Sequence, residues 1–182
     1  MHFEITLKEN ESSNTNDSIV TFPINLKELV WATQETYSNL GTPYAPIRAD
    51  NFISLTGNEF PSIPPDTHLE IKLISEDEAE KHYASNLVCC LAKNVGKKFN
   101  NERIQVIGNG WKSIFKLESE NLLCAPDGTL YISPNTQGIC AIQTLNDALD
   151  SYISYSILFR LSIKERTYYF VLDPVVHIRS RD

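Results

Sequence analysis

The sequence predicts an α+β fold, in which about three helices pack on one face of a mostly antiparallel sheet formed by the C-terminal half. Three observations lead to this prediction. Apolar and polar residues alternate near the C-terminus, two segments show helical spacing behind capping residues, and a Pro-Asp-Gly turn separates two apolar runs. We expect residues 1–182 to form a single domain. A two-lobed split would fall in the connection 42–66, which holds five of the nine prolines.

The N-terminal region is expected to contain two strands followed by a helix. Residues 2–8 alternate between apolar and polar side chains, and residues 18–22 form a second apolar run. These two segments predict a hairpin with a long polar loop. Asn25 then precedes a helical pattern over residues 25–39, and Glu28 stands three positions after it, as in a capping box.

The clearest helical pattern follows a further strand in the middle of the chain. Residues 68–74 alternate as a half-buried strand, and Ser75 and Glu78 form a second capping box. Apolar residues recur behind this box at helical spacing, so a helix is predicted over 75–96. Acidic residues in its first turn and lysines near its end suit the helix dipole. A third, short helix is predicted over 144–151.

The other segments of the C-terminal half predict strands. They are expected at 103–107, 111–117, 122–125, 129–132 and 138–143. Pro126-Asp127-Gly128 is a strong hairpin signal between two of them. From Ile153 to Ile163 almost every second residue is apolar, and residues 168–172 are apolar on both faces. They predict a long antiparallel hairpin whose second strand is central. If this hairpin borders the sheet, it would offer an edge for strand addition.

Charge is distributed unevenly along the chain. Residues 1–90 carry 5 Lys and Arg against 14 Asp and Glu, whereas residues 91–182 carry 11 against 9. A field of one sign steers association with an oppositely charged partner without determining the fold. We therefore expect the acidic segment with Glu76, Asp77 and Glu80 to contact another protein through a basic surface of that protein.

Several function classes are disfavoured by the motifs that the sequence lacks. It shows no targeting segment, no membrane-spanning run, and neither of the common glycine-rich nucleotide loops. The four cysteines lack CxxC spacing, and the histidines lack ligand spacing, so no metal or cofactor is expected and the thiols are interpreted as reduced. The sequence thus favours a non-catalytic interaction protein (a subunit, adaptor, assembly factor or inhibitor), located in the cytoplasm or nucleus.

One alternative is enzymatic. Asp50, followed by Glu70 and Lys72 on a strand, resembles the pattern of metal-dependent nucleases of the PD-(D/E)xK type. In such a site two carboxylates hold a divalent ion and the lysine activates water or stabilises charge. The acidic N-terminal half opposes this hypothesis because it repels a phosphate backbone.

A second alternative is nucleic-acid binding through segment 93–116. Its basic residues would neutralise phosphates while interleaved aromatic residues stack on bases. These basic residues are Lys93, Lys97, Lys98, Arg103, Lys112 and Lys116. A sequence pI of about 5.1 makes this alternative less favoured than a protein partner.

Overall fold

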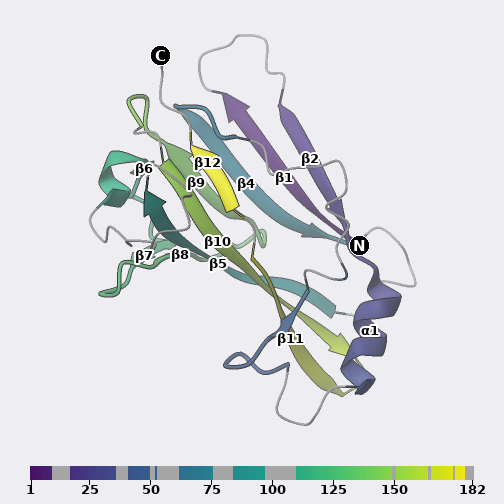
Figure 1. Cartoon of the computed structure of the whole chain (residues 1–182). Helices are drawn as coiled ribbons and strands as arrows, with labels where there is room; N and C mark the ends of the chain where they lie inside the picture. The colour runs from purple at the N-terminus through teal and green to yellow at the C-terminus, as the bar shows by residue number, and fades with distance from the viewer. Residues whose placement is uncertain are drawn as a thin grey trace.

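The structure, a computed structural model of the whole chain, consists mainly of β-strands arranged in two sheets (Figure 1). It describes residues 1–9, 17–35, 41–49, 52, 62–75, 84–96, 110–148, 151–163, 165–173 and 175–178. Within these ranges, α1 (Leu26–Glu35) is the only α-helix, and η2 (Gly110–Ser113) is a 3-10 turn. The predicted α+β fold with about three helices is therefore wrong: the described chain is mostly strand, and residues 84–96, which the prediction gave to its longest helix, form a strand.

The first sheet has five strands, and all of its neighbouring strands run antiparallel. Hairpin β1–β2 and strand β4 form one side of this sheet, and the two short strands β9 and β6 complete it. In spatial order the strands are β2 (Ser18–Pro23), β1 (His2–Glu9), β4 (Thr67–Ile74), β9 (Cys140–Thr144) and β6 (Phe115–Lys116).

The second sheet has seven strands. Among its described strand pairs, β3 and β11 run parallel to each other and the others are antiparallel. β12 pairs with β10 beside the path formed by the other six strands. These six, in spatial order, are β3 (Ile47–Arg48), β11 (Arg166–Leu172), β10 (Ser151–Ile163), β5 (Ala84–Gly96), β8 (Leu130–Ile132) and β7 (Leu122–Cys124), while β12 spans Val175–Ile178.

The long hairpin near the C-terminus is present, but its first strand is the central one. β10 pairs with β5 along one side and with β11 and then β12 along the other. The register of β11 continues into β12, from Ile163 opposite Arg166 to Ser151 opposite Ile178. β11 in turn has the two-residue strand β3 as its outer neighbour. β10 therefore cannot accept a partner strand, and β11 is not the central strand that the sequence predicted.

The predicted helix over 75–96 is the main error, because Ala84–Gly96 forms strand β5. Within β5 a β-bulge interrupts the regular alternation: Leu87 pairs with Phe159 and Cys89 with Leu158, which leaves Val88 as the extra residue. The bulge places the buried side chains Leu87 and Cys90 three positions apart, a spacing typical of helices. Pairing with β10 and β8 provides hydrogen-bond partners for backbone N–H and C=O groups that would pair within the segment if it were a helix.

Two other local predictions also differ from the structure. No helix forms at 144–151 among the described residues, since β9 ends at Thr144, residues 145–148 turn, and β10 begins at Ser151. Of the predicted strand 111–117, residues 111–113 lie in the 3-10 turn η2 and only residues 115–116 form a strand, β6. The predicted strand 103–107 lies outside the described residues.

The structure confirms the predicted N-terminal hairpin, the start of the first helix, and the hairpin around the Pro-Asp-Gly turn. β1 and β2 pair as an antiparallel hairpin, and β7 and β8 pair around the Pro-Asp-Gly turn. α1 begins directly after Asn25, whose side-chain Oδ1 accepts a hydrogen bond of 3.3 Å from the backbone N–H of Glu28. This is the bond that an N-cap residue is expected to make.

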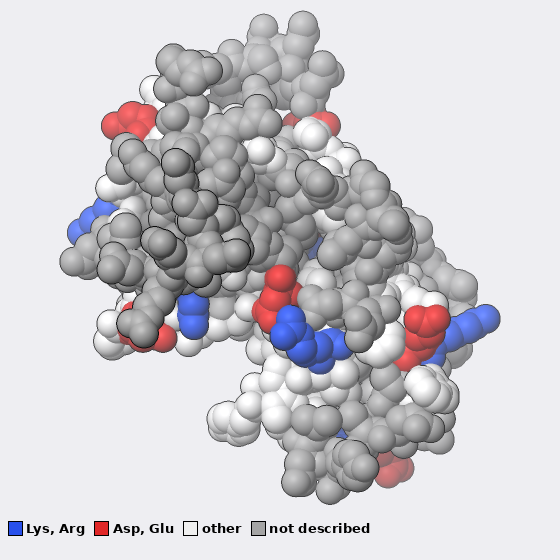
Figure 2. Space-filling model, viewed as in Figure 1, with Lys and Arg blue, Asp and Glu red and all other residues white. Residues whose placement is uncertain are grey.

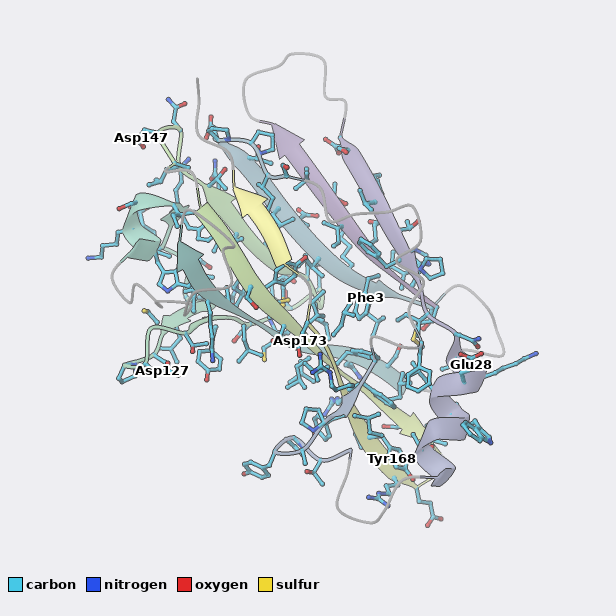
Figure 3. The ribbon with its side chains drawn as sticks, in the orientation of Figure 1. Phe3, Glu28, Asp127, Asp147, Tyr168 and Asp173 are labelled. Carbon is cyan, nitrogen blue, oxygen red and sulfur yellow. The ribbon has the colours of Figure 1, made fainter. Side chains whose placement is uncertain are left out.

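Buried side chains from both sheets form one core. Phe3 of β1 meets Phe159 of β10 edge to face, with ring centroids 5.1 Å apart, and Phe159 stacks on Phe170 of β11 at 5.3 Å. All three side chains are fully buried, and Figure 3 shows Phe3 near the centre of the molecule. The alternation in β10 directs its odd-numbered residues into this core, from Ile153 to Ile163.

Candidate functional site

Charged side chains gather on the face of the five-stranded sheet that lies opposite the core. Phe3, Ile5 and Leu7 of β1 point into the core, so the even-numbered residues of this strand project from the other face. The register then sets Glu4 opposite Lys72 and Lys8 opposite His68 of β4. We call the resulting cluster the β1–β4 charge network: Glu4, Lys8, His68, Glu70 and Lys72.

Glu70 is the centre of this network. Its Oε1 lies 2.8 Å from Lys8 Nζ and 3.5 Å from His68 Nε2, and its Oε2 lies 3.2 Å from Lys72 Nζ. Lys72 Nζ is also 3.6 Å from Glu4 Oε1. Both oxygens of the Glu70 carboxylate therefore have a positively charged partner on a neighbouring strand or on the same strand.

The electrostatics of Glu70 and Lys8 agree with this geometry. Partial burial by itself raises the pKa of Glu70, but hydrogen bonds from Lys8 and Lys72 and their charges outweigh burial and lower it below 4.5. The hydrogen bond to Glu70 raises the pKa of Lys8 above 10.5. Each partner thus favours the charged form of the other, as expected of a stabilising ion pair.

A smaller polar cluster lies next to the network, where β9 and β6 border the sheet. Asp66 Oδ1 accepts a hydrogen bond of 3.2 Å from Gln143 Nε2 and lies 3.6 Å from Lys116 Nζ. Thr144 Oγ1 donates to the carbonyl of Pro64 at 2.8 Å and accepts from the backbone N–H of Thr67 at the same distance. These bonds tie the segment before β4 to β9, so they position the strand that carries Glu70.

The structure places two of the three predicted nuclease residues. Glu70 and Lys72 do share one face of β4, as the hypothesis requires, but they pair with each other and with β1. Asp50 lies outside the described residues. Within the described ranges, no three His, Cys, Asp or Glu side chains are arranged to hold a metal ion. The arrangement therefore suits strand–strand stabilisation better than coordination of a divalent ion.

The acidic residues predicted to contact a partner, Glu76, Asp77 and Glu80, also lie outside the described residues. They belong to the connection between β4 and β5, which joins one sheet to the other. The hydroxyls of Ser75 and Ser85, on either side of this connection, form a hydrogen bond of 3.1 Å. The two ends of the acidic connection are thus held close together, and the described part of the predicted helix 75–96, from Ala84 onward, is strand β5.

Other charges on the described surface are mixed in sign. Figure 2 shows acidic and basic side chains lying beside one another on the viewed face, without a broad area of one sign among the described residues. Arg48 Nη2, for example, lies 3.5 Å from Asp173 Oδ2. A steering field would therefore have to come mainly from segments such as the acidic connection.

The segment predicted to bind nucleic acid is divided between several elements. Lys93 is exposed on β5, Lys112 on η2 and Lys116 on β6, whereas Lys97, Lys98 and Arg103 lie outside the described residues. The aromatic residues Trp111 and Phe115 are buried and stack on each other with centroids 5.9 Å apart. They are therefore not available to stack on bases, whereas the contribution of the basic residues stays a prediction.

Trp111 has a structural role that its sequence context did not reveal. Its Nε1–H donates a hydrogen bond of 2.8 Å to the carbonyl of Gly128, in the turn between β7 and β8. In the same turn, Asp127 accepts hydrogen bonds from the backbone N–H and the hydroxyl of Thr129, both at 3.0 Å. These bonds lower the pKa of Asp127. The turn is thereby fixed against η2.

The structure also reveals groups that sequence reasoning did not select. Cys90 of β5 and Cys140 of β9 meet inside the core, although no local motif links them. Four large apolar side chains are exposed among the described residues, and Trp31 on the outer face of α1 is the largest of them. The four are Ile19, Trp31, Tyr44 and Leu123. A pattern search could have found none of them, because each depends on which face of an element is covered.

Comparisons with known proteins give no relative for this chain. No protein-family model matches it, and neither the curated proteins nor the solved structures contain a match. In the described part of the chain, no helix has the length and apolar character needed to cross a membrane.

Proposed function

We propose that this chain is a non-catalytic protein that acts by binding another protein, as a subunit, adaptor, assembly factor or inhibitor. The observation that supports this proposal is the pairing within the β1–β4 charge network. Glu70 and Lys72 are the two described residues that the nuclease hypothesis requires, yet Lys8, Lys72 and His68 together occupy both oxygens of the Glu70 carboxylate. A carboxylate that is already neutralised in this way contributes to stability and is poorly placed to bind a metal or activate water.

The charge of the N-terminal half indicates the chemistry of the partner. The connection between β4 and β5 carries Glu76, Asp77, Glu78 and Glu80 against a single Lys81. The Ser75–Ser85 hydrogen bond anchors both of its ends at the framework. A short acidic connection that leaves and rejoins the framework at neighbouring points favours contact with a basic protein surface, and its charge would accelerate encounter.

The test begins with affinity capture of the tagged chain from its native cells after nuclease treatment, followed by association kinetics with the stoichiometric partner. The triple variant E76A/D77A/E80A should associate about 10-fold or more slowly at low salt, with a weaker dependence on ionic strength, because steering is lost. The matched control E118A/E120A/E165A removes three exposed carboxylates elsewhere and should leave the association rate nearly unchanged.

Three results would contradict the proposal. Equal association rates for the acidic variant and the wild type would remove the steering role of the connection. Cleavage of nucleic acid that requires a divalent ion and disappears in a folded Glu70→Ala variant would support the nuclease hypothesis instead. Retention of a nucleic acid with steep salt dependence, weakened by Lys93→Ala and Lys112→Ala, would favour the nucleic-acid-binding alternative.

A further inference from the structure

Two buried cysteines from different sheets lie together in the core. Cys90 belongs to β5 of the seven-stranded sheet, and Cys140 begins β9 of the five-stranded sheet. Their exposed fractions are 1% and 2%. All four cysteines of the chain are free thiols in this structure, and Cys124 on β7 is exposed.

Ile132 of β8 is the common neighbour of the two thiols. Cys90 is paired directly with Ile132 across β5 and β8, which sets their Cα atoms about 4.5–5.5 Å apart. Cys140 Sγ donates a hydrogen bond of 3.2 Å to the backbone carbonyl of the same Ile132. The two side chains thus approach one residue from two strands, and the proximity of Cys140 is the first of the causes that raise the pKa of Cys90.

We propose that Cys90 and Cys140 are a disulfide-forming pair that links the two sheets covalently when the chain folds in the presence of an oxidising thiol–disulfide couple. The oxidant is a small-molecule disulfide such as oxidised glutathione. The thiolate of one cysteine attacks this disulfide and releases one glutathione, and the second cysteine then displaces the other glutathione. The two protein thiols lose two protons and two electrons in total, and one glutathione disulfide becomes two glutathione thiols.

The environment of the pair determines when this reaction occurs. The hydrogen bond with Cys140, burial and the neighbouring thiols all raise the pKa of Cys90. Burial, followed by the proximity of Cys140, raises the pKa of Cys89 to about 11. Since the thiolate is the reacting species, the folded protein protects these thiols, and oxidation belongs to folding or to transient opening of the core.

Cys89 is the obvious competitor, and its position explains why it is not the partner. It precedes Cys90 in β5, and successive side chains of a strand point to opposite faces. It is only partly buried, whereas Cys90 points into the core from which Cys140 approaches. For the same reason Cys89 and Cys90 cannot easily bridge each other.

The experiment is refolding of the full chain from denaturant in a glutathione buffer of defined redox potential. Free thiols are then alkylated, and peptides are mapped by mass spectrometry without reduction. The expected product is a peptide pair joined through Cys90 and Cys140, with Cys89 and Cys124 alkylated and the intact mass lower by two hydrogens. Refolding in reducing buffer should give the same secondary structure with all four cysteines alkylated.

Variants and stability give a second readout. Cys89→Ala and Cys124→Ala should still form the linked peptide, whereas Cys90→Ala or Cys140→Ala should abolish it. The oxidised wild type should unfold at a higher urea concentration than the reduced protein, because a cross-link restricts the unfolded chain. The proposal is overturned if the folded, oxidised wild type contains both cysteines as free thiols, or if the mapped link joins Cys140 to Cys89.

Discussion

At the scale of single residues, the structure shows which charged groups surround the Glu70–Lys72 pattern of the sequence. The sequence places Glu70 and Lys72 on one face of a strand, but it does not show what lies opposite. The register of β1 supplies Lys8 and Glu4, which complete a set of alternating charges. Cross-strand pairs of opposite charge stabilise a sheet. Glu70 therefore contributes to the stability of the folded state through its charged form.

The first prediction concerns the pH dependence of this contribution. The pKa of Glu70 is lowered in the folded state, so its stabilisation is present above its unfolded value of 4.5 and is lost as pH falls through the lowered pKa. The Glu70→Gln variant has no carboxylate at this position, so its unfolding free energy should lack this pH-dependent loss. The difference in unfolding free energy between wild type and variant should therefore narrow as pH falls from about 7 to about 3.

Urea denaturation at several pH values measures this difference. Glu118→Gln is the control, since it removes an exposed carboxylate outside the network. A constant difference between wild type and Glu70→Gln over the whole range would show that the carboxylate contributes nothing through its charge.

Lys8 follows the opposite rule: its raised pKa gives stability that is present below 10.5 and is lost as pH rises through the raised value.

At the scale of elements, α1 shows that signals within a few residues can be sufficient to predict a helix. Asn25 caps the helix through its side chain, and Leu29 is fully buried on the inner face. Glu28 and Trp31 are exposed on the outer face, and Figure 3 shows Glu28 projecting from the helix. The cap and the apolar spacing lie within a few residues of each other, so they operate before any tertiary contact forms.

The second prediction is that Asn25→Ala weakens this helix. Loss of the capping hydrogen bond should lower the unfolding free energy by about 0.5–2 kcal/mol, whereas Asn25→Ser should retain most of the stability. Thermal or urea unfolding followed by circular dichroism measures both variants. Equal stability of the alanine and serine variants would show that the 3.3 Å contact is not a working cap.

β5 shows the opposite situation, in which a local signal is overridden. Its apolar residues suit a helix, but extended structure lets both edges of the segment pair, with β10 on one side and β8 on the other. Helix propensity is a weak preference that tertiary context routinely overrides. The bulge at Val88 then lets Leu87 and Cys90 both face the core although they are three positions apart.

At the scale of the whole molecule, the core is what holds the two sheets together. Phe3 comes from the first strand of one sheet and Phe159 from the central strand of the other. Aromatic pairs in edge-to-face contact are stabilised beyond the burial of their area. The contact between these two rings is therefore one of the interactions that couple the two sheets.

The third prediction tests this coupling with a double-mutant cycle. Phe3→Leu and Phe159→Leu should each destabilise the protein, and together they should show a coupling energy of about 0.5–1.5 kcal/mol. Phe3→Leu combined with Phe115→Leu is the control pair, for which the two effects should add. Urea unfolding of the four proteins in each cycle gives the values. Additivity in the Phe3–Phe159 cycle would mean that the rings do not couple the sheets.

The sequence by itself determined the features whose signals lie within a few residues. These are the alternation of β1, β4 and β10, the cap of α1, and the turn between β7 and β8. Only the tertiary structure decided that residues 84–96 form a strand and that β10 is central in its sheet. It also decided that Glu70 pairs with Lys8 and that Cys90 lies near Cys140. The physical reason is that strand pairing and burial depend on residues far apart in the chain, and their free energies exceed local preferences.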